Sequence, residues 1–407
     1  FISPLTFILS LIMWLIFDSG HNSFQFLCTI DWLPAFNFYY TVGVDGISLF
    51  FLILTTFLIM VCVLISWGSI NYRLKEYLIN FLLLEFLLIQ VFSVLDLLLF
   101  YVFFESILMP MFLIIGIWGS RERKIRAAYQ FFLYTLVGSV LMLLGILIIY
   151  SHGGTTDLQM LWNLEFSEKK QIFLWVSFFL SFAVKIPMMP FHIWLPEAHA
   201  EAPTAGSVIL AGILLKMGAY GFLRFSLPMF PFATVFFTPL IFVLSLIATI
   251  YASLTTLRQV DLKKIIAYSS ISHMGFVTIG IFTLNVQGLE GSIFLMLSHG
   301  LVSSALFFCV GILYDRYHTR VIKYYSGLVQ VMPIFSIFFL FFSFANIGFP
   351  GTSSFVGELL VLIGTFQSSF ILTLFTGFSL VLGTAYSIWM FNRVMFGTLK
   401  LQYFTTF

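Results

Sequence analysis

Charged side chains are scarce in this sequence: only 9% of its 407 residues are Asp, Glu, Lys or Arg, while 60% are hydrophobic. A soluble domain has about 25% charged residues, which keep its surface hydrated. A folded surface with so few charges would not stay in water, which excludes the soluble classes of enzyme and of binding protein. The composition indicates a chain embedded in a membrane.

Cysteine is also scarce, and the nucleotide-binding motifs are missing. Cys28, Cys62 and Cys309 lie far apart, whereas an iron–sulfur cluster needs several thiolates and a structural zinc site needs closely spaced ligands. Neither a GxGxxG loop nor a Walker motif occurs. We therefore expect no cofactor and no metal in this chain. It opens on Phe1 inside an apolar run without a basic n-region, so no signal peptide is predicted.

Long apolar runs recur along the whole chain. Each is long enough to cross about 30 Å of hydrocarbon as a helix. We predict twelve spans, at 1–17, 47–67, 77–93, 95–118, 128–150, 171–193, 203–226, 233–255, 263–283, 288–313, 330–368 and 370–392. Almost every Lys and Arg outside them follows an even-numbered span, and only Lys169, Lys170 and Arg224 are assigned to the other side. The positive-inside rule places the basic loops in the cytoplasm or matrix.

Spans three to seven and eight to twelve form two groups of five, so the second group enters the membrane from the opposite face. The fourth member of each group has a helix breaker, Lys185-Ile186-Pro187 in one and Gly348-Phe349-Pro350-Gly351 in the other. Interrupted helices at matching positions indicate a transport path, although proline and glycine are also simply common in membrane helices. The predicted fold is all-α: a polytopic transmembrane helical bundle with two inverted five-helix repeats and broken helices.

This pattern divides the chain into four parts. We predict N-terminal helices with a loop on the face opposite the basic loops at 1–76, the first repeat at 77–227, the second repeat at 228–393 and a C-terminal tail at 394–407.

Lys185, Lys216, His273 and His299 lie near the middle of their spans. A charge at that depth costs at least about 2.5 to 3.5 kcal/mol, so an unpaired lysine there would readily lose its proton and could act as a switchable carrier. Lysine suits this role because arginine stays charged. The alternative is that these groups only hold helices together through buried hydrogen bonds. Several such groups in one chain favour function, because each adds its own insertion cost.

Two glutamates extend this set. Glu105 lies within the fourth span and is the natural partner of Lys185, and moving it away or near would favour proton release or uptake. Glu358 follows the second break and would be the exit or terminal carrier. His273 and His299 could bridge from Lys216 to Glu358, since imidazole both donates and accepts protons.

Other polar residues have competing interpretations. Glu85 is either a further carboxylate of the path or the partner of a polar neighbour. Asp96 is expected to be an exposed helix cap. His192, Glu197 and His199 occur together in PFHIWLPEAHAEAPT, but two prolines break any helical ligand face, so a metal site is not expected.

Five strings of the sequence look like one family: FFESILMPMFLIIGIWG, FAVKIPMMPFHIWLPEAHAEAPTAGSVILAGILLKMGAYG, DLKKIIAYSSISHMG, LMLSHGLVSSALFF and FPGTSSFVGE. They resemble the antiporter-like membrane-arm subunits of respiratory complex I, and the match runs through nearly the whole chain. The resemblance implies a subunit that pumps protons across the mitochondrial inner membrane while other subunits oxidise NADH and reduce ubiquinone. The 53 phenylalanines, which fit a low-GC coding bias as easily as a structural need, also hint at an organellar genome.

The resemblance assigns the family's proton-transfer residues to Glu105, Lys185, Lys216, His273 and His299. Glu358 replaces the lysine usual in the second broken helix of the other antiporter-like subunits, and it points to the subunit 4 branch. The family's first and last helices have no counterpart among the twelve spans, and no lateral helix follows Arg393. Expected partners are the lipid bilayer and other membrane-arm subunits, with antiporter-like subunits 2 and 5 on the flanks. No nucleic acid and no direct NADH or quinone site are expected.

Two rival classes remain. A subunit of a multisubunit sodium/proton antiporter would have similar membrane helices. A purely structural membrane scaffold would make the buried ionisable groups dispensable.

Overall fold

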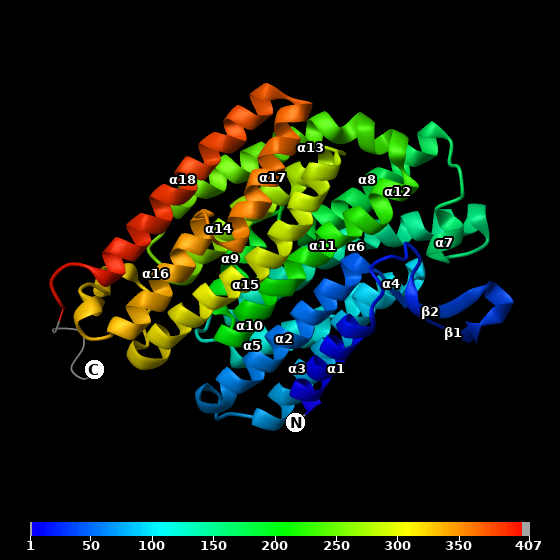
Figure 1. Ribbon diagram of the computed structural model, residues 1–407. Helices are drawn as coiled ribbons and strands as arrows, with labels where there is room; N and C mark the ends of the chain where they lie inside the picture. Colours follow the sequence, from blue (N-terminus) through cyan, green and yellow to red (C-terminus); the bar gives the residue numbers. More distant parts are fainter. Residues whose placement is uncertain (1, 401–407) are drawn as a thin grey trace. The chain divides into compact units, whose positions relative to one another are not determined.

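The computed structural model describes residues 2–400, and nearly all of its regular structure is helical (Figure 1). The predicted all-α class is therefore confirmed. The described chain forms two compact units. The first consists of residues 2–186, 201–209 and 213–237, and the second of residues 187–200, 210–212 and 238–400. Of the predicted C-terminal tail, residues 401–407 lie outside the described part.

The first unit is built from the N-terminal half of the chain. Its helices are α1 (Ile2–Ile16), α2 (Gly46–Ser69), α3 (Leu74–Ser93), α4 (Leu97–Ser106), α5 (Leu108–Trp118), α6 (Lys124–Gly153), α7 (Leu158–Leu161), α8 (Glu168–Lys185), α10 (Thr204–Ile209), α11 (Leu215–Gly221) and α12 (Leu227–Met229). Helix α6 packs along α8, and α11 packs against α8 as well. Those two contacts determine where the buried lysines of this unit lie.

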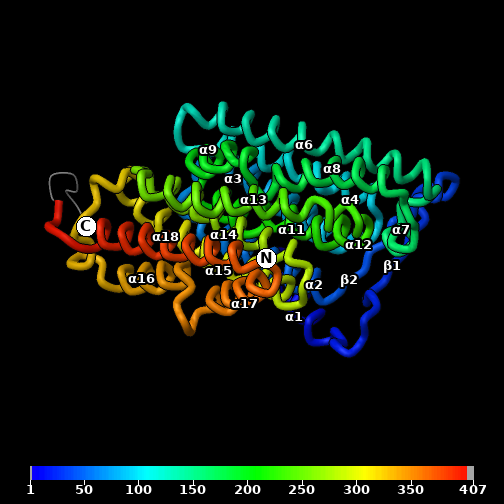
Figure 2. Tube along the Cα trace, turned by 90° about the horizontal axis from the view of Figure 1, so that it is seen from above, coloured from blue at the N-terminus to red at the C-terminus, as the bar shows by residue number. Residues whose placement is uncertain are grey.

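The second unit contains the helices of the C-terminal half. They are α9 (Trp194–Glu201), most of α13 (Pro231–Thr256), α14 (Leu262–Phe282), α15 (Val286–Tyr317), α16 (Pro333–Ile347), α17 (Ser353–Ser368) and α18 (Phe370–Met395). Helix α15 packs against both α14 and α17, and α16 lies beside α18 (Figure 2). The segments that hold the predicted histidines and Glu358 are therefore mutual neighbours.

Within residues 2–400, nine helical segments are long and apolar enough to cross a membrane. The other predicted spans are also helical: α1 and α16 are shorter apolar helices, and α8 has charged residues at both ends, among them Glu168 and Lys185. The boundaries follow the predicted runs because each helix begins or ends where the apolar sequence meets polar residues, proline or glycine.

Both predicted helix breaks are present. Helix α8 ends at Lys185 and the next helix begins only at Trp194. Helix α16 ends at Ile347, and Gly348 follows with φ +78°, a left-handed conformation that suits glycine. The chain resumes as α17 at Ser353. The proline and glycine signals thus located both interruptions correctly.

A β-hairpin replaces the plain loop expected between the first two spans. Strands β1 (Gln25–Leu33) and β2 (Phe38–Val44) are antiparallel, with Cys28 opposite Val42 and Ile30 opposite Tyr40. A short 3-10 turn at Pro34–Phe36 joins them, and Asn37 ends it in the left-handed region. The apolar residues of β1 are exposed along most of the strand, so the alternation that would have identified a half-buried strand is missing.

The predicted loop position of Arg224 is wrong. Arg224 is only 7% exposed and lies inside the helical segment Thr204–Met229, where its Nη2 donates to Asp45 Oδ1 at 2.6 Å. Asp45 also caps α2 by accepting from the Ser48 amide. Burial on its own would raise the pKa of Asp45, but the Arg224 guanidinium and the hydrogen bonds from Ser48 together outweigh burial and lower that pKa. This ion pair compensates a buried charge near the end of the predicted span 203–226.

The expected exposure of Asp96 is also wrong, although its capping role is correct. Asp96 accepts from the Leu99 amide at the start of α4 and is only 2% exposed. The Thr156 hydroxyl donates to its other oxygen. The reason is that the segment before α7 pairs with the chain before α4 and covers this carboxylate.

Candidate functional site

Lys185 is the last residue of α8 and is only 2% exposed. Its Nζ lies 4.4 Å from the centroid of the Phe104 ring. Within the described residues, Nζ has no protein hydrogen-bond partner. A ring face attracts a cation without accepting a proton from it. A ring face, and not a hydrogen-bond acceptor of the described chain, therefore lies beside the buried Lys185 Nζ.

Glu105 lies one residue before the end of α4 and interacts electrostatically with Lys185. Across residues 2–400 the two form no ion pair within 4.0 Å. The helix is irregular immediately after Glu105, since it turns at Ile107 and Pro110 offers no amide to the Ser106 carbonyl. Glu105 and Lys185 are therefore near each other, but no direct ion pair joins them.

Two small residues of α6, Gly138 and Ser139, allow the helices around Lys185 to pack closely. A Cβ at Gly138 would lie 3.0 Å from the Val184 side chain, so α6 and α8 come close beside Lys185. Ser139 follows on α6 and lies next to the Glu105 side chain. Three helices thus surround the Glu105 and Lys185 groups.

Lys216 is completely buried in α11. A π-helical turn precedes that helix at Leu210–Leu214, and another follows it at Phe222–Ser226. Such turns are rare and are frequent at functional sites. A Cβ at Gly218 would come within 2.9 Å of the Phe182 carbonyl oxygen, so α11 touches the last turn of α8. The helix of Lys216 is therefore adjacent to the helix end that bears Lys185.

The second unit gathers the remaining predicted residues. Glu358 of α17 is 3% exposed, and its Oε1 lies 3.5 Å from His273 Nδ1 of α14. The His273 ring centroid is 5.5 Å from that of His299 on α15. Three adjacent helices thus bring a carboxylate and two imidazoles into one buried cluster.

Two features of this cluster were not predicted from the sequence: the contact of Gly348 with Glu358, and the presence of Tyr386. A Cβ at Gly348 would lie 2.0 Å from Glu358 Oε2, so the second helix break makes room for the carboxylate. Tyr386 of α18 is 1% exposed and interacts electrostatically with Glu358. Gly348 was recognised only as a breaker, and nothing in the sequence separates Tyr386 from the other aromatic residues.

Glu85 lies outside both clusters. It is buried in α3 and accepts a hydrogen bond from the Thr6 hydroxyl of α1. This contact favours the interpretation of Glu85 as the partner of a polar neighbour.

The residues of the PFHIWLPEAHAEAPT run have partners of their own. Glu197 Oε1 pairs with Lys264 Nζ at 2.6 Å, and the His199 ring stacks on Phe307 with centroids 4.7 Å apart. Within the described chain, no group of three or more His, Cys, Asp or Glu is placed to hold a metal ion.

The fold and the site define a class of protein: a multi-pass membrane protein in which titratable groups gather at interrupted helices, an arrangement suited to moving ions or protons. The family model described as NADH:quinone oxidoreductase/Mrp antiporter, TM matches residues 94–384. The chain belongs to this family.

Similar proteins support the assignment over the whole chain. The "NADH-ubiquinone oxidoreductase chain 4" of Chondrus crispus is 74% identical over 406 residues, which are 100% of this chain and 82% of that protein. The protein of the same name from Arabidopsis thaliana is 64% identical over 405 residues, with the same coverage of both.

Two solved structures share the fold. A chain of "Respiratory complex I from Thermus thermophilus with bound NADH" has a TM-score of 0.90 and 32% identity, over 97% of this chain and 83% of that chain. A chain of the Mrp complex from Dietzia sp. DQ12-45-1b has a TM-score of 0.86 at 20% identity, over 98% of this chain and 74% of that chain. The second likeness concerns the fold alone.

Proposed function

We propose that this chain moves protons across the membrane as a subunit of NADH:ubiquinone oxidoreductase, respiratory complex I, while other subunits carry out the redox chemistry. The observation that supports it most is the pair of buried clusters, one beside each helix break. Glu105 and Lys185 meet at the first break, and His273 and Glu358 meet at the second. A scaffold would gain little from burying these groups beside the helix breaks, because each group adds its own insertion cost.

In the first unit, Lys185 would bind and release the proton. The negative end of the helix dipole at the end of α8 favours its charged form, and so does a nearby Glu105 carboxylate. A shift of the carboxylate at the irregular turn after it would weaken this attraction and favour release. Lys216, one helix away, would receive the proton from Lys185 and is buried from bulk water.

In the second unit, the two imidazoles would pass the proton on. A neutral imidazole accepts a proton on one nitrogen and releases another from the opposite nitrogen. His299 and His273 are adjacent, and His273 Nδ1 faces the Glu358 carboxylate. Glu358 would then be the terminal carrier. Glu85 would have a smaller part in proton transfer, because the Thr6 hydroxyl already donates a hydrogen bond to its carboxylate.

We infer the membrane, the orientation and the partners of the chain from its charges and its relatives. We place it in the mitochondrial inner membrane with the basic loops facing the matrix, because loop Lys and Arg gather on one side of the predicted topology. Its partners would be other membrane-arm subunits, with antiporter-like subunits 2 and 5 as neighbours. The chain itself would hold no cofactor.

A sodium/proton antiporter subunit is the alternative, since the Mrp complex chain has the same fold. The identity of 74% with a complex I subunit along the whole chain favours the complex I function.

Removing sodium separates these functions. In sealed vesicles containing the assembled complex, NADH-driven acidification should proceed at the same rate when potassium replaces all sodium, because lysine, histidine and glutamate transfer protons directly. A protonophore should abolish it in both media. Acidification that stops without sodium, or a chain that purifies apart from NADH oxidation activity, would rule out the proposed function.

A further inference from the structure

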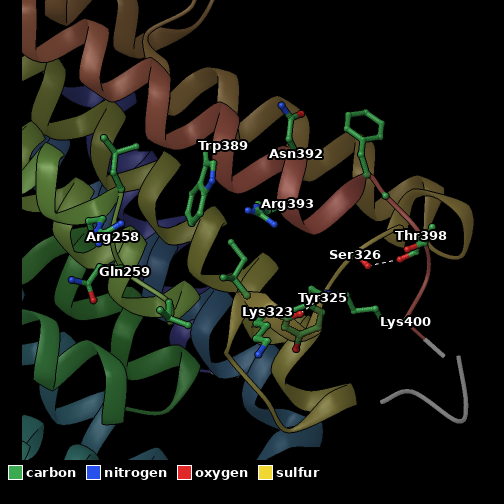
Figure 3. A pocket seen from close by; sticks show the side chains of 15 residues that line it. Arg258, Gln259, Lys323, Tyr325, Ser326, Trp389, Asn392, Arg393, Thr398 and Lys400 are labelled. Atoms are coloured by element: carbon green, nitrogen blue, oxygen red, sulfur yellow. Dashed lines mark hydrogen bonds between the residues drawn. The ribbon is translucent and has the colours of Figure 1, made fainter. Parts of the chain in front are cut away.

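A basic pocket of about 750 Å³ lies in the second unit, and its lining does not include Glu358, His273 or His299. Its walls come from the segment after α13, the turn around Ile322–Tyr324, the end of α18 and the segment after α18 (Figure 3). Four cations line it, namely Arg258, Lys323, Arg393 and Lys400, and no lining residue is an Asp or Glu. The pocket is large enough for a small ligand.

The cations have few protein partners. Lys400 Nζ donates to the Lys323 carbonyl oxygen at 2.5 Å. In residues 2–400, the side chains of Arg258, Lys323 and Arg393 make no ion pair, and all three are exposed. Four like charges around one space repel each other, and an anion bound between them would relieve that repulsion. The pocket therefore has the electrostatic character of an anion site.

The pocket lies where two membrane-spanning helices end. Helix α13 ends at Thr256 and α18 ends at Met395, directly before the lining segments. Trp389 lines the pocket from within α18, and tryptophan is enriched at the level of lipid headgroups. Phe396 and Ile322 form an apolar part of the pocket lining beside the cations. A ligand with a negative head and an apolar body suits this combination.

We propose that this pocket binds the phosphate of an anionic membrane phospholipid. Basic pockets between membrane helices recognise such headgroups, and each Lys or Arg near the surface adds to the attraction. The site goes beyond the proposed function, because lipid binding requires neither proton transfer nor redox chemistry.

The test uses the assembled complex in phosphatidylcholine vesicles that contain a photoactivatable phosphatidylglycerol. Cross-linking is mapped by peptide as the probe fraction rises. The wild-type chain should be labelled on the end of α18, and the Arg258→Gln/Arg393→Gln variant should need about thirtyfold more probe for half-maximal labelling. The control Arg126→Gln/Arg316→Gln removes two exposed arginines outside the pocket and should label like wild type.

Two further arms identify the ligand. A matching phosphatidylcholine probe should label this peptide much less, and excess inorganic phosphate should leave the phosphatidylglycerol labelling unchanged. Displacement by inorganic phosphate would assign the pocket to free phosphate and overturn the lipid proposal. Labelling unchanged in the pocket variant, or equal with both lipid probes, would overturn it as well. Because the readout is labelling, it does not depend on whether the chain pumps protons.

Discussion

Lys185→Met should lower proton transfer through this subunit about a hundredfold, as expected when a positioned proton-transfer group is removed. Methionine has a similar length and no insertion cost, so the end of α8 should keep its packing against Phe104. The variant would keep Glu105 at the first helix break but would lose the lysine that binds and releases the proton. The measurement is NADH-driven acidification of sealed vesicles that contain the assembled complex.

Two companion variants separate proton transfer from structure. Lys169→Met changes an exposed lysine at the other end of the same helix and should pump normally. Lys185→Arg keeps a charge but cannot release its proton, so it should fail like the methionine variant. Wild-type pumping by an assembled Lys185→Met complex would mean that the lysine has no role in proton transfer.

Glu358→Gln should produce a loss of similar size, about a hundredfold, at the second break. Glutamine has nearly the same shape, so it should still fit against Gly348 and face His273. It cannot take up and release a proton as a carboxylate does. The imidazole pair would then lead to a group unable to pass the proton on. The same acidification assay measures the effect, with NADH oxidation recorded in parallel.

The matched control is Glu290→Gln, which changes an exposed glutamate on α15. Glu358→Asp retains a carboxylate at a shifted position and should recover part of the activity. Equal loss in the aspartate and glutamine variants would indicate that Glu358 acts through packing, and the terminal-carrier role would have to be abandoned.

The helices and their breaks could be predicted because their causes are local. Apolar length determines the spans, and Pro187 and Gly348 interrupt them whatever surrounds them. The β-hairpin was missed because its exposed apolar strand has no alternation. The position of Arg224 was missed because it depends on Asp45, a residue far away in sequence.

The candidate residues could be predicted from their depth in the spans, and so could the pairing of Glu105 with Lys185, but the finer surroundings of these residues could not. A lysine or glutamate in an apolar run is conspicuous in any sequence, so Lys185, Lys216 and Glu358 could be selected from the sequence. The π-helical turns around Lys216 leave no such signal, because they arise from packing along the whole helix. The contact of Glu358 with Gly348 likewise required the fold.

The central claim is that the buried groups of both units serve one proton path, and the double variant Lys185→Met/Glu358→Gln tests it most directly. Groups on a single path act as a unit, so their losses do not add. We predict that NADH-driven acidification by the double variant, measured above the passive leak, equals that of the slower single variant. If the two losses multiply instead, the clusters act independently and the single path is contradicted.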